Sequence, residues 1–250
     1  MIFTIAAREL RSLFLSPLAW AILAVTQCIL AFQFLSHIEY FMELQPQLAA
    51  LEGAPGIADL IIAPLFADAA TVLLLITPLI TMRVLSEERR SRTLSLLFSA
   101  PVSMTEIVIG KYLGVLGFFV VLLAMLALMP LSLLAGSTLD LGKLAACMLG
   151  LLLIMTAFSA MGVYLSSLTQ QPTVAAVTTY GLVLMLLILR RGSGLSGGES
   201  GVLGYLSIIE HYEPLLKGLV NSTDIAYYLL IAVLFLVFTV RQLDRMRLQN

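Results

Sequence analysis

The sequence predicts an all-α membrane protein with six membrane-spanning helices. Its 250 residues are 60% hydrophobic and 12% charged, and the mean hydropathy is +1.02. The apolar residues are gathered into long continuous runs that charged connectors separate. About 20 apolar residues cross the hydrocarbon of a bilayer as a helix, because a helix satisfies its backbone amides and carbonyls without water. A membrane β-barrel would instead need short segments of alternating polarity.

The distribution of basic residues predicts that both termini lie in the cytoplasm, because Lys and Arg are enriched in cytoplasmic connectors. The predicted spans are roughly Leu18 to Leu35, Pro64 to Leu85, Ile107 to Ala135, Leu144 to Leu165, Val174 to Leu189 and Ile225 to Val240. In this orientation most of the 14 basic residues are cytoplasmic, namely Arg8, Arg11, Arg83, Arg89, Arg90, Arg92, Lys111, Arg241, Arg245 and Arg247. The net charge of −1 gives no reason to expect a nucleic-acid partner.

Residues 1–16 are expected to form an amphipathic helix in the inner interface of the membrane. Arg8, Glu9 and Arg11 fall away from its apolar face, and Pro17 turns the chain into the first span. The apolar face consists of Phe3, Ile5, Ala6, Leu10, Leu13 and Phe14. Such a helix either anchors the protein in the interface or contacts a partner protein.

The cytoplasmic loop over residues 86–103 is predicted to hold a short helix followed by a break. Ser86 is a suitable N-cap, and Glu87 and Glu88 complement the positive end of the helix dipole. Ser103 and Glu106 form a capping box for the next helix. The short helix has the apolar residues Leu94, Leu97 and Phe98, the basic residues Arg89, Arg90 and Arg92, and Pro101 at its end. An apolar stripe rimmed by charge indicates a docking site, whereas the alternative is that the charges only set the topology.

Two outer connectors also contain helical patterns. In the first, Phe41, Leu44, Leu48 and Leu51 have helical spacing, so part of it is expected on the outer leaflet. The second, residues 190–224, is expected to include a short interfacial helix formed by Leu206, Ile208, Ile209, Tyr212, Leu215 and Leu216.

No catalytic, cofactor or metal site is predicted in this chain. Leu195 to Glu199 match the signature sequence of ATP-binding-cassette ATPases, but the chain has no P-loop to present a nucleotide to it. An aspartyl protease of the membrane needs two carboxylates, and only Asp68 approaches a span interior. His37 and His211 fall at the outer surface without an HExxH motif, and water-facing loop side chains are the favoured interpretation over metal ligands.

Three groups of motifs resemble the permeases of type-2 ABC transporters, specifically the branch associated with gliding motility and nitrous-oxide reductase maturation. The inner group is Ser86-Glu87-Glu88-Arg89-Arg90, Thr93, Leu96-Leu97, Ser99-Ala100-Pro101-Val102-Ser103, Glu106-Ile107-Val108 and Gly110-Lys111-Tyr112-Leu113. The outer group is Ser207 to Glu213 with Gly218 and Asp224 before Tyr227-Tyr228, and the opening group is Ala7 to Leu10 with Ser16-Pro17. One departure is Ser95, which stands where the family often has Glu in a Gly-Thr-x-Glu motif.

The resemblance implies a single ABC-2 type transmembrane domain over residues 1–250. It implies that Glu87 to Ala100 form a coupling helix that rests in a groove of a separate cytoplasmic ATPase, which would bind ATP and Mg. The residues assigned to this contact are Glu87, Glu88, Arg89, Arg90, Arg92, Thr93, Leu94, Leu97, Phe98 and Pro101. Glu210, His211 and Glu213 are candidates for contact with an extracytoplasmic partner. Two permease chains, identical or related, are expected to pair.

The function expected from these observations is that of the permease subunit of an ATP-driven exporter in the bacterial cytoplasmic membrane. An alternative is a non-transporting anchor that transmits the motion of an ATPase to an outer partner protein. A lipid-modifying enzyme is disfavoured, because acid and base groups within reach of the bilayer are missing. The apolar pathway permits lipids, peptides or hydrophobic small molecules as cargo.

Overall fold

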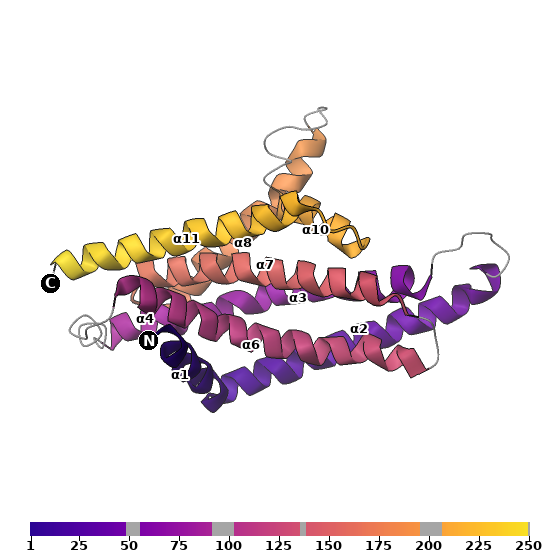
Figure 1. The fold of residues 1–250 in the computed structure, drawn as a ribbon, viewed down its shortest axis with the longest axis horizontal. Coiled ribbons are helices and arrows are strands. Elements are labelled where there is room, and N and C mark those ends of the chain that lie inside the picture. The colour runs from indigo at the N-terminus through magenta and orange to yellow at the C-terminus, as the bar shows by residue number, and fades with distance from the viewer. Residues whose placement is uncertain (49–55, 92–102, 136–138, 196–206, 250) are drawn as a thin grey trace.

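The computed structural model describes residues 1–48, 56–91, 103–135, 139–195 and 207–249, and this part of the chain contains helices and no strands (Figure 1). Their bounds are α1 (Ile2–Leu15), α2 (Pro17–Leu48), the π-helix η1 (Ala58–Ile62), α3 (Ala63–Thr81), α4 (Arg83–Arg90), α6 (Met104–Ser132), the 3-10 helix η2 (Leu133–Ala135), α7 (Leu141–Leu168), α8 (Pro172–Leu195), α10 (Ile208–Leu216) and α11 (Ser222–Gln249).

Five helical segments of the described chain are long and apolar enough to cross a membrane. They are Pro17–Gln47, Ala58–Arg90, Met104–Ser132, Leu141–Leu168 and Ser222–Leu248, and they match five of the six predicted spans. The remaining predicted span, Val174 to Leu189, falls in α8, whose described apolar stretch Pro172–Leu187 is shorter. A sixth crossing therefore stays a prediction.

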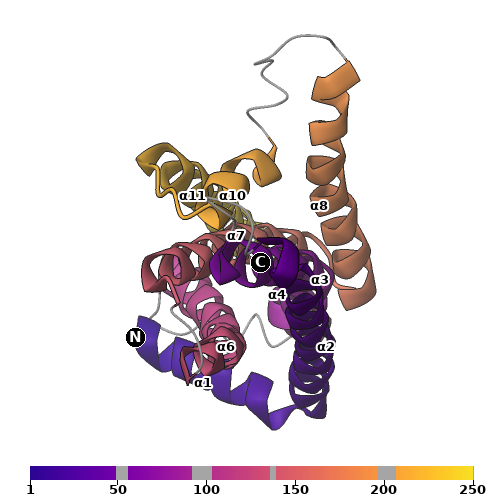
Figure 2. The ribbon, with the colours of Figure 1, turned by 90° about the vertical axis from the view of Figure 1, so that its right-hand side faces the viewer.

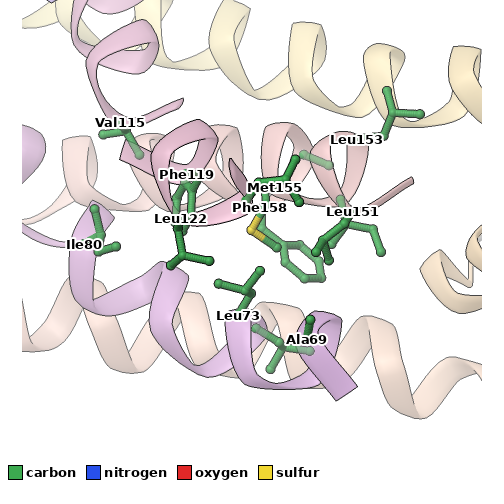
Figure 3. Close-up of a cluster of buried hydrophobic side chains, with 14 of the residues drawn as sticks. Ala69, Leu73, Ile80, Val115, Phe119, Leu122, Leu151, Leu153, Met155 and Phe158 are labelled. Carbon is green, nitrogen blue, oxygen red and sulfur yellow. The ribbon is translucent and has the colours of Figure 1, made fainter. Parts of the chain in front are cut away.

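Helix α7 lies at the centre of the bundle. It packs against α3, α4, α6, α8, α10 and α11, and 72% of its most apolar stretch is buried, compared with 22% for α11. Figure 3 shows Leu73 of α3, with Phe119 and Leu122 of α6, meeting Met155 and Phe158 of α7 in the core. Helix α8 contacts α7, α3, α10 and α4, while its C-terminal turns project away from the bundle (Figure 2). The chain thus forms one bundle around α7 with α8 at its edge.

The expected N-terminal helix is present as α1, but its apolar face packs on protein. Ile5, Leu10 and Leu13 pack against the buried core, while Phe3 points outward and is 83% exposed. Ser16 is extended, and α2 begins at Pro17 as predicted. The Trp20 indole N–H donates to the Phe14 carbonyl over 2.8 Å, which holds the angle between α1 and α2.

The prediction that Ser86 caps a new helix is wrong. Helix α4 begins at Arg83, separated from the end of α3 only by Met82, and Ser86 lies buried inside it with its hydroxyl donating to the Met82 carbonyl. The second span therefore continues to Arg90, because Val84 and Leu85 extend its buried face. The predicted capping box is confirmed, since the Glu106 amide donates to the Ser103 hydroxyl over 3.2 Å and the Ser103 amide donates to Glu106 Oε2 over 3.1 Å.

The two outer helical patterns have different outcomes. Phe41 and Leu44 belong to α2 itself, so they form no separate helix on the outer leaflet, and Leu51 lies outside the described residues. The short helix predicted in the second connector is present as α10. It packs against α7, α8 and α11, so its apolar face is covered by protein.

The close approach of α3 and α7 at Gly162 predicts that substitution of this glycine destabilises the protein more than substitution of Gly181. A Cβ added at Gly162 would collide with the Thr81 side chain, whereas a Cβ at Gly181 in α8 would meet nothing within 4 Å. We expect Gly162→Ala to lower the free energy of unfolding by about 1–3 kcal/mol through overpacking. Gly181→Ala should be neutral or stabilising, because Ala has the higher helix propensity. Thermal unfolding of both variants in detergent checks this, and equal melting temperatures would contradict the packing.

Candidate functional site

Lys111 joins three helices at one end of the bundle. This side chain of α6 is buried, with 4% of its surface exposed. Its Nζ lies 3.0 Å from Glu9 Oε2 of α1 and 2.8 Å from Glu88 Oε1 of α4. A buried ammonium is stable only when anionic partners replace the water it loses. We call Lys111, Glu9 and Glu88 the Lys111 junction, and the end of the bundle that holds it the α1–α4 end. Both chain termini lie at this end (Figure 1).

Two glycines of α6 allow α1 to approach the Lys111 junction. A Cβ at Gly110 would lie 2.7 Å from Ile5 Cβ, and a Cβ at Gly114 would lie 2.6 Å from Glu9 Cβ. Neither position has room for a side chain, so Ile5 and Glu9 of α1 pack directly on the backbone of α6, as small residues allow between membrane helices. This contact places the carboxylate of Glu9 next to the ammonium of Lys111.

A second set of polar contacts fixes α4 to the last turn of α7. The Ser166 hydroxyl accepts from the amides of Leu85 and Ser86, each over 3.1 Å, and donates to the Met82 carbonyl over 2.8 Å. The Arg89 guanidinium donates to the Ser167 carbonyl over 2.5 Å. These contacts satisfy backbone groups at the break between α3 and α4, which would otherwise be unpaired in an apolar setting. Helix α4 is thus held by α6 and α7 together.

The structure separates the residues that were assigned to ATPase coupling. Glu88 and Arg89 point into the bundle, toward Lys111 and Ser167, whereas Glu87 and Arg90 are exposed. Outside the described residues lie Arg92, Thr93, Leu94, Leu97, Phe98 and Pro101.

Sequence reasoning missed four residues of this site, namely Glu9, Lys111, Ser166 and Ser167. One signal was available, because Lys111 is an ionisable residue inside an otherwise apolar run, where such residues are rare and usually paired. Nothing local in the sequence indicates that Glu9 and Glu88, which are far apart along the chain, meet on it.

Two hollows flank α4 at the α1–α4 end. The larger, of about 850 Å³, lies between α4 and the turn from α7 to α8, where Gln170, Gln171 and Thr173 line it. The smaller, of about 290 Å³, lies among α1, α2, α3 and α6. Arg83 and Glu87 line both hollows, so α4 separates the two.

At the other end of the bundle, hydrogen bonds and ring contacts hold α10. His211 Nδ1 lies 2.7 Å from Asp224 Oδ1 of α11, and the imidazole stacks on Tyr227 with ring centroids 4.0 Å apart. The Tyr228 hydroxyl donates to the Ile208 carbonyl over 2.6 Å, and the Tyr212 hydroxyl donates to the Phe66 carbonyl over 2.9 Å. Burial raises the pKa of the Tyr212 phenol well above its usual range, so the hydroxyl keeps its proton and remains a donor.

The three residues named for an outer partner differ in accessibility. His211 is 7% exposed and faces Asp224, so the prediction of a water-facing loop side chain is wrong for it. Glu213 is half-buried, and Glu210 is exposed. His37, at the same end, lies with its Nε2 2.8 Å from Asp68 Oδ2, which joins α2 to α3. Among the described residues, no three His, Cys, Asp or Glu side chains come close enough to hold a metal ion.

Comparison with protein-family models gives a match over almost the whole chain. A family model described as ABC-2 family transporter protein matches residues 3–248. A search of curated proteins found no match.

The Lys111 junction predicts a stability loss that depends on charge. Lys111→Met leaves Glu9 and Glu88 without their common partner, so we expect the free energy of unfolding to fall by about 2 kcal/mol or more. The triple variant Lys111→Met, Glu9→Gln, Glu88→Gln removes the charges together and should regain at least half of the loss. Thermal unfolding in detergent measures both. A single variant as stable as the parent, or a triple variant less stable than the single one, would contradict the junction.

The contacts of His211 predict that α10 is held less tightly when this side chain is removed. His211→Ala removes both the Asp224 contact and the Tyr227 stack, and we expect it to destabilise the docked helix by about 1–3 kcal/mol. Hydrogen exchange over residues 208–216 should then become faster, while Glu210→Ala, on the exposed side of the same helix, should leave the exchange unchanged. Equal exchange in the two variants would show that His211 does not hold α10.

Proposed function

Because the chain belongs to the ABC-2 family of transporter proteins, we propose that it is the membrane-spanning permease subunit of an ATP-driven exporter. The family makes it a multi-pass membrane transport component and not an enzyme. In this proposal, two copies of a separate cytoplasmic ATPase bind ATP and Mg and supply the energy. Two permease chains, identical or related, pair in the bacterial cytoplasmic membrane.

The observation that carries the proposal is the attachment of α4 to the bundle. This charged helix continues the span of α3 and is held by Lys111 of α6 and by Ser166 and Ser167 of α7. A force applied to its end at Arg90 therefore reaches the central helix of the bundle through ion pairs and hydrogen bonds. If rigid helices move to transport a solute, the helix on which the ATPase acts must be firmly connected to the helices that line the transport pathway.

The exposed charges at the α1–α4 end support docking of a soluble partner there. Arg8 and Arg11 on α1 and Arg90 on α4 are exposed. Charges that remain hydrated at a rim speed encounter and set the register of a complex, while buried apolar side chains supply most of the affinity. In the proposed mechanism Leu94, Leu97 and Phe98 supply those anchors. The role of Glu87 to Ala100 as a coupling helix rests on the resemblance of the sequence to the family.

Substitution in the proposed coupling helix tests the function directly. Leu97→Asp places a charge in the apolar contact, so we expect loss of ATPase association and of ATP-driven transport, with the bundle still folded. Co-purification measures association, and vesicles that contain the permease and its ATPase measure ATP-driven movement of amphiphilic solutes. Unchanged association and transport in this variant would overturn the assignment.

A matched pair of charge reversals distinguishes a specific contact with the ATPase from a nonspecific effect of the net charge. Arg90→Glu should weaken ATPase association by about fivefold, as expected for an exposed charge at a contact rim. Arg245→Glu on α11, which is also exposed and predicted to be cytoplasmic, should have little effect. If the parent permease binds the ATPase and stimulates hydrolysis but moves no solute, the exporter proposal fails and a mechanical anchor takes its place.

A further inference from the structure

The smaller hollow at the α1–α4 end is lined by both apolar and charged side chains. Its volume is about 290 Å³, near the lower limit for ligand pockets. Its apolar side chains include Ala19 and Ile22 of α2, Ile80 of α3 and Phe118 of α6, which we call the apolar wall. The charged side chains are Glu9, Arg83 and Glu87. A hollow of this composition suits an amphiphile, with its chain on the apolar wall and its headgroup at the charged side chains.

Arg83 and Glu87 are the charges available to a ligand in this hollow. Glu9 is already bound to Lys111. Within the described chain, by contrast, no ion pair joins Arg83 or Glu87 to another residue, and both are exposed. The two residues are four positions apart on α4, so their Cβ atoms are about 5–6 Å apart on one helix face. A cation and an anion therefore stand side by side next to an apolar wall.

We propose that this hollow binds the headgroup of a phospholipid that carries both a phosphate and a primary ammonium, as phosphatidylethanolamine does. Arg83 pairs with the phosphate, Glu87 pairs with the ammonium, and an acyl chain follows the apolar wall toward Phe118. The inference deepens the proposed function, because it names a zwitterionic phospholipid as the class of cargo or regulatory lipid on which the exporter acts.

Charge complementarity favours this ligand over the other amphiphiles. A purely anionic headgroup would satisfy Arg83 but would stand beside the uncompensated carboxylate of Glu87. A purely cationic amphiphile would satisfy Glu87 and leave the guanidinium of Arg83 without an anion. The larger hollow, of about 850 Å³, shares Arg83 and Glu87 and is lined by Gln170 and Gln171, so it offers a polar route to the same charges.

Photolabelling of the full chain in nanodiscs tests the site without any ATPase. The probes are phosphatidylethanolamine and phosphatidylglycerol with the same photoreactive acyl chain, and a long-chain alkylamine with the same photoreactive group. We expect phosphatidylethanolamine to label peptides from α2 and α3 that contain Ile22 and Ile80 more strongly than the other two probes.

The two charge variants give different signatures, which a merely structural role would not produce. Arg83→Gln should lower labelling by both phospholipids by about fivefold, whereas Glu87→Gln should lower labelling by phosphatidylethanolamine alone. Equal labelling by all three probes in the parent chain, or loss of both phospholipids in Glu87→Gln, would overturn the proposal. Both side chains are exposed, so neither substitution is expected to prevent folding.

A pair of substitutions on α2 tests the apolar wall. Ala19→Phe fills the hollow and should abolish labelling, while Val25→Phe, at a position that is 58% exposed on the same helix, should leave it unchanged. Persistent labelling of α2 and α3 in a folded Ala19→Phe variant would place the lipid elsewhere and overturn the site. If Ala19→Phe does not fold, the charge variants decide the question. Labelling as expected together with failed ATPase association would refute the proposed exporter and leave the lipid site intact.

Discussion

The ammonium of Lys111, buried among apolar helices, is the constraint on which the α1–α4 end depends. A lone buried charge would cost several kcal/mol, so the arrangement requires that Glu9 and Glu88 reach it. Glu9 reaches it only because Gly110 and Gly114 have no side chains and let α1 lie directly on α6. Charge and packing are therefore coupled, since the ion pairs fix α1 and α4, and the close helix contact makes those pairs possible.

The Lys111 junction and the His211–Asp224 pair, at opposite ends of the bundle, differ in burial. In the Lys111 junction 20% and 25% of the Glu9 and Glu88 side chains are accessible. At the α10 end His211 and Asp224 are almost fully buried, and the ring of Tyr227 stacks on the imidazole. Partly hydrated ion pairs can rearrange at lower cost than a buried hydrogen-bonded cluster. The ion pairs of Lys111 can thus rearrange at lower cost than the contact of His211 with Asp224.

Helix α4 is bound to the rest of the bundle, and it also lines two hollows. Glu88 and Arg89 face the bundle, whereas Arg83 and Glu87 face the hollows on either side. A displacement of α4 would change the shape of both hollows and the position of the charges that line them. In the proposed exporter this geometry links the proposed ATPase contact to the proposed lipid site, without a long chain of intermediate residues.

The sequence alone determined the fold class, five of the spans, the helix over residues 1–16, the capping box at Ser103 and the presence of α10. These features depend on local hydropathy and local hydrogen bonds, which neighbouring residues decide. Tertiary structure decided that α4 continues α3 instead of starting at Ser86, because Val84 and Leu85 are buried and Ser166 of α7 accepts from the amides of Leu85 and Ser86. It also decided that Lys111 pairs with Glu9 and Glu88 and that His211 pairs with Asp224. Such pairs depend on which helix faces meet, and that information is not contained in the spacing of residues along one helix.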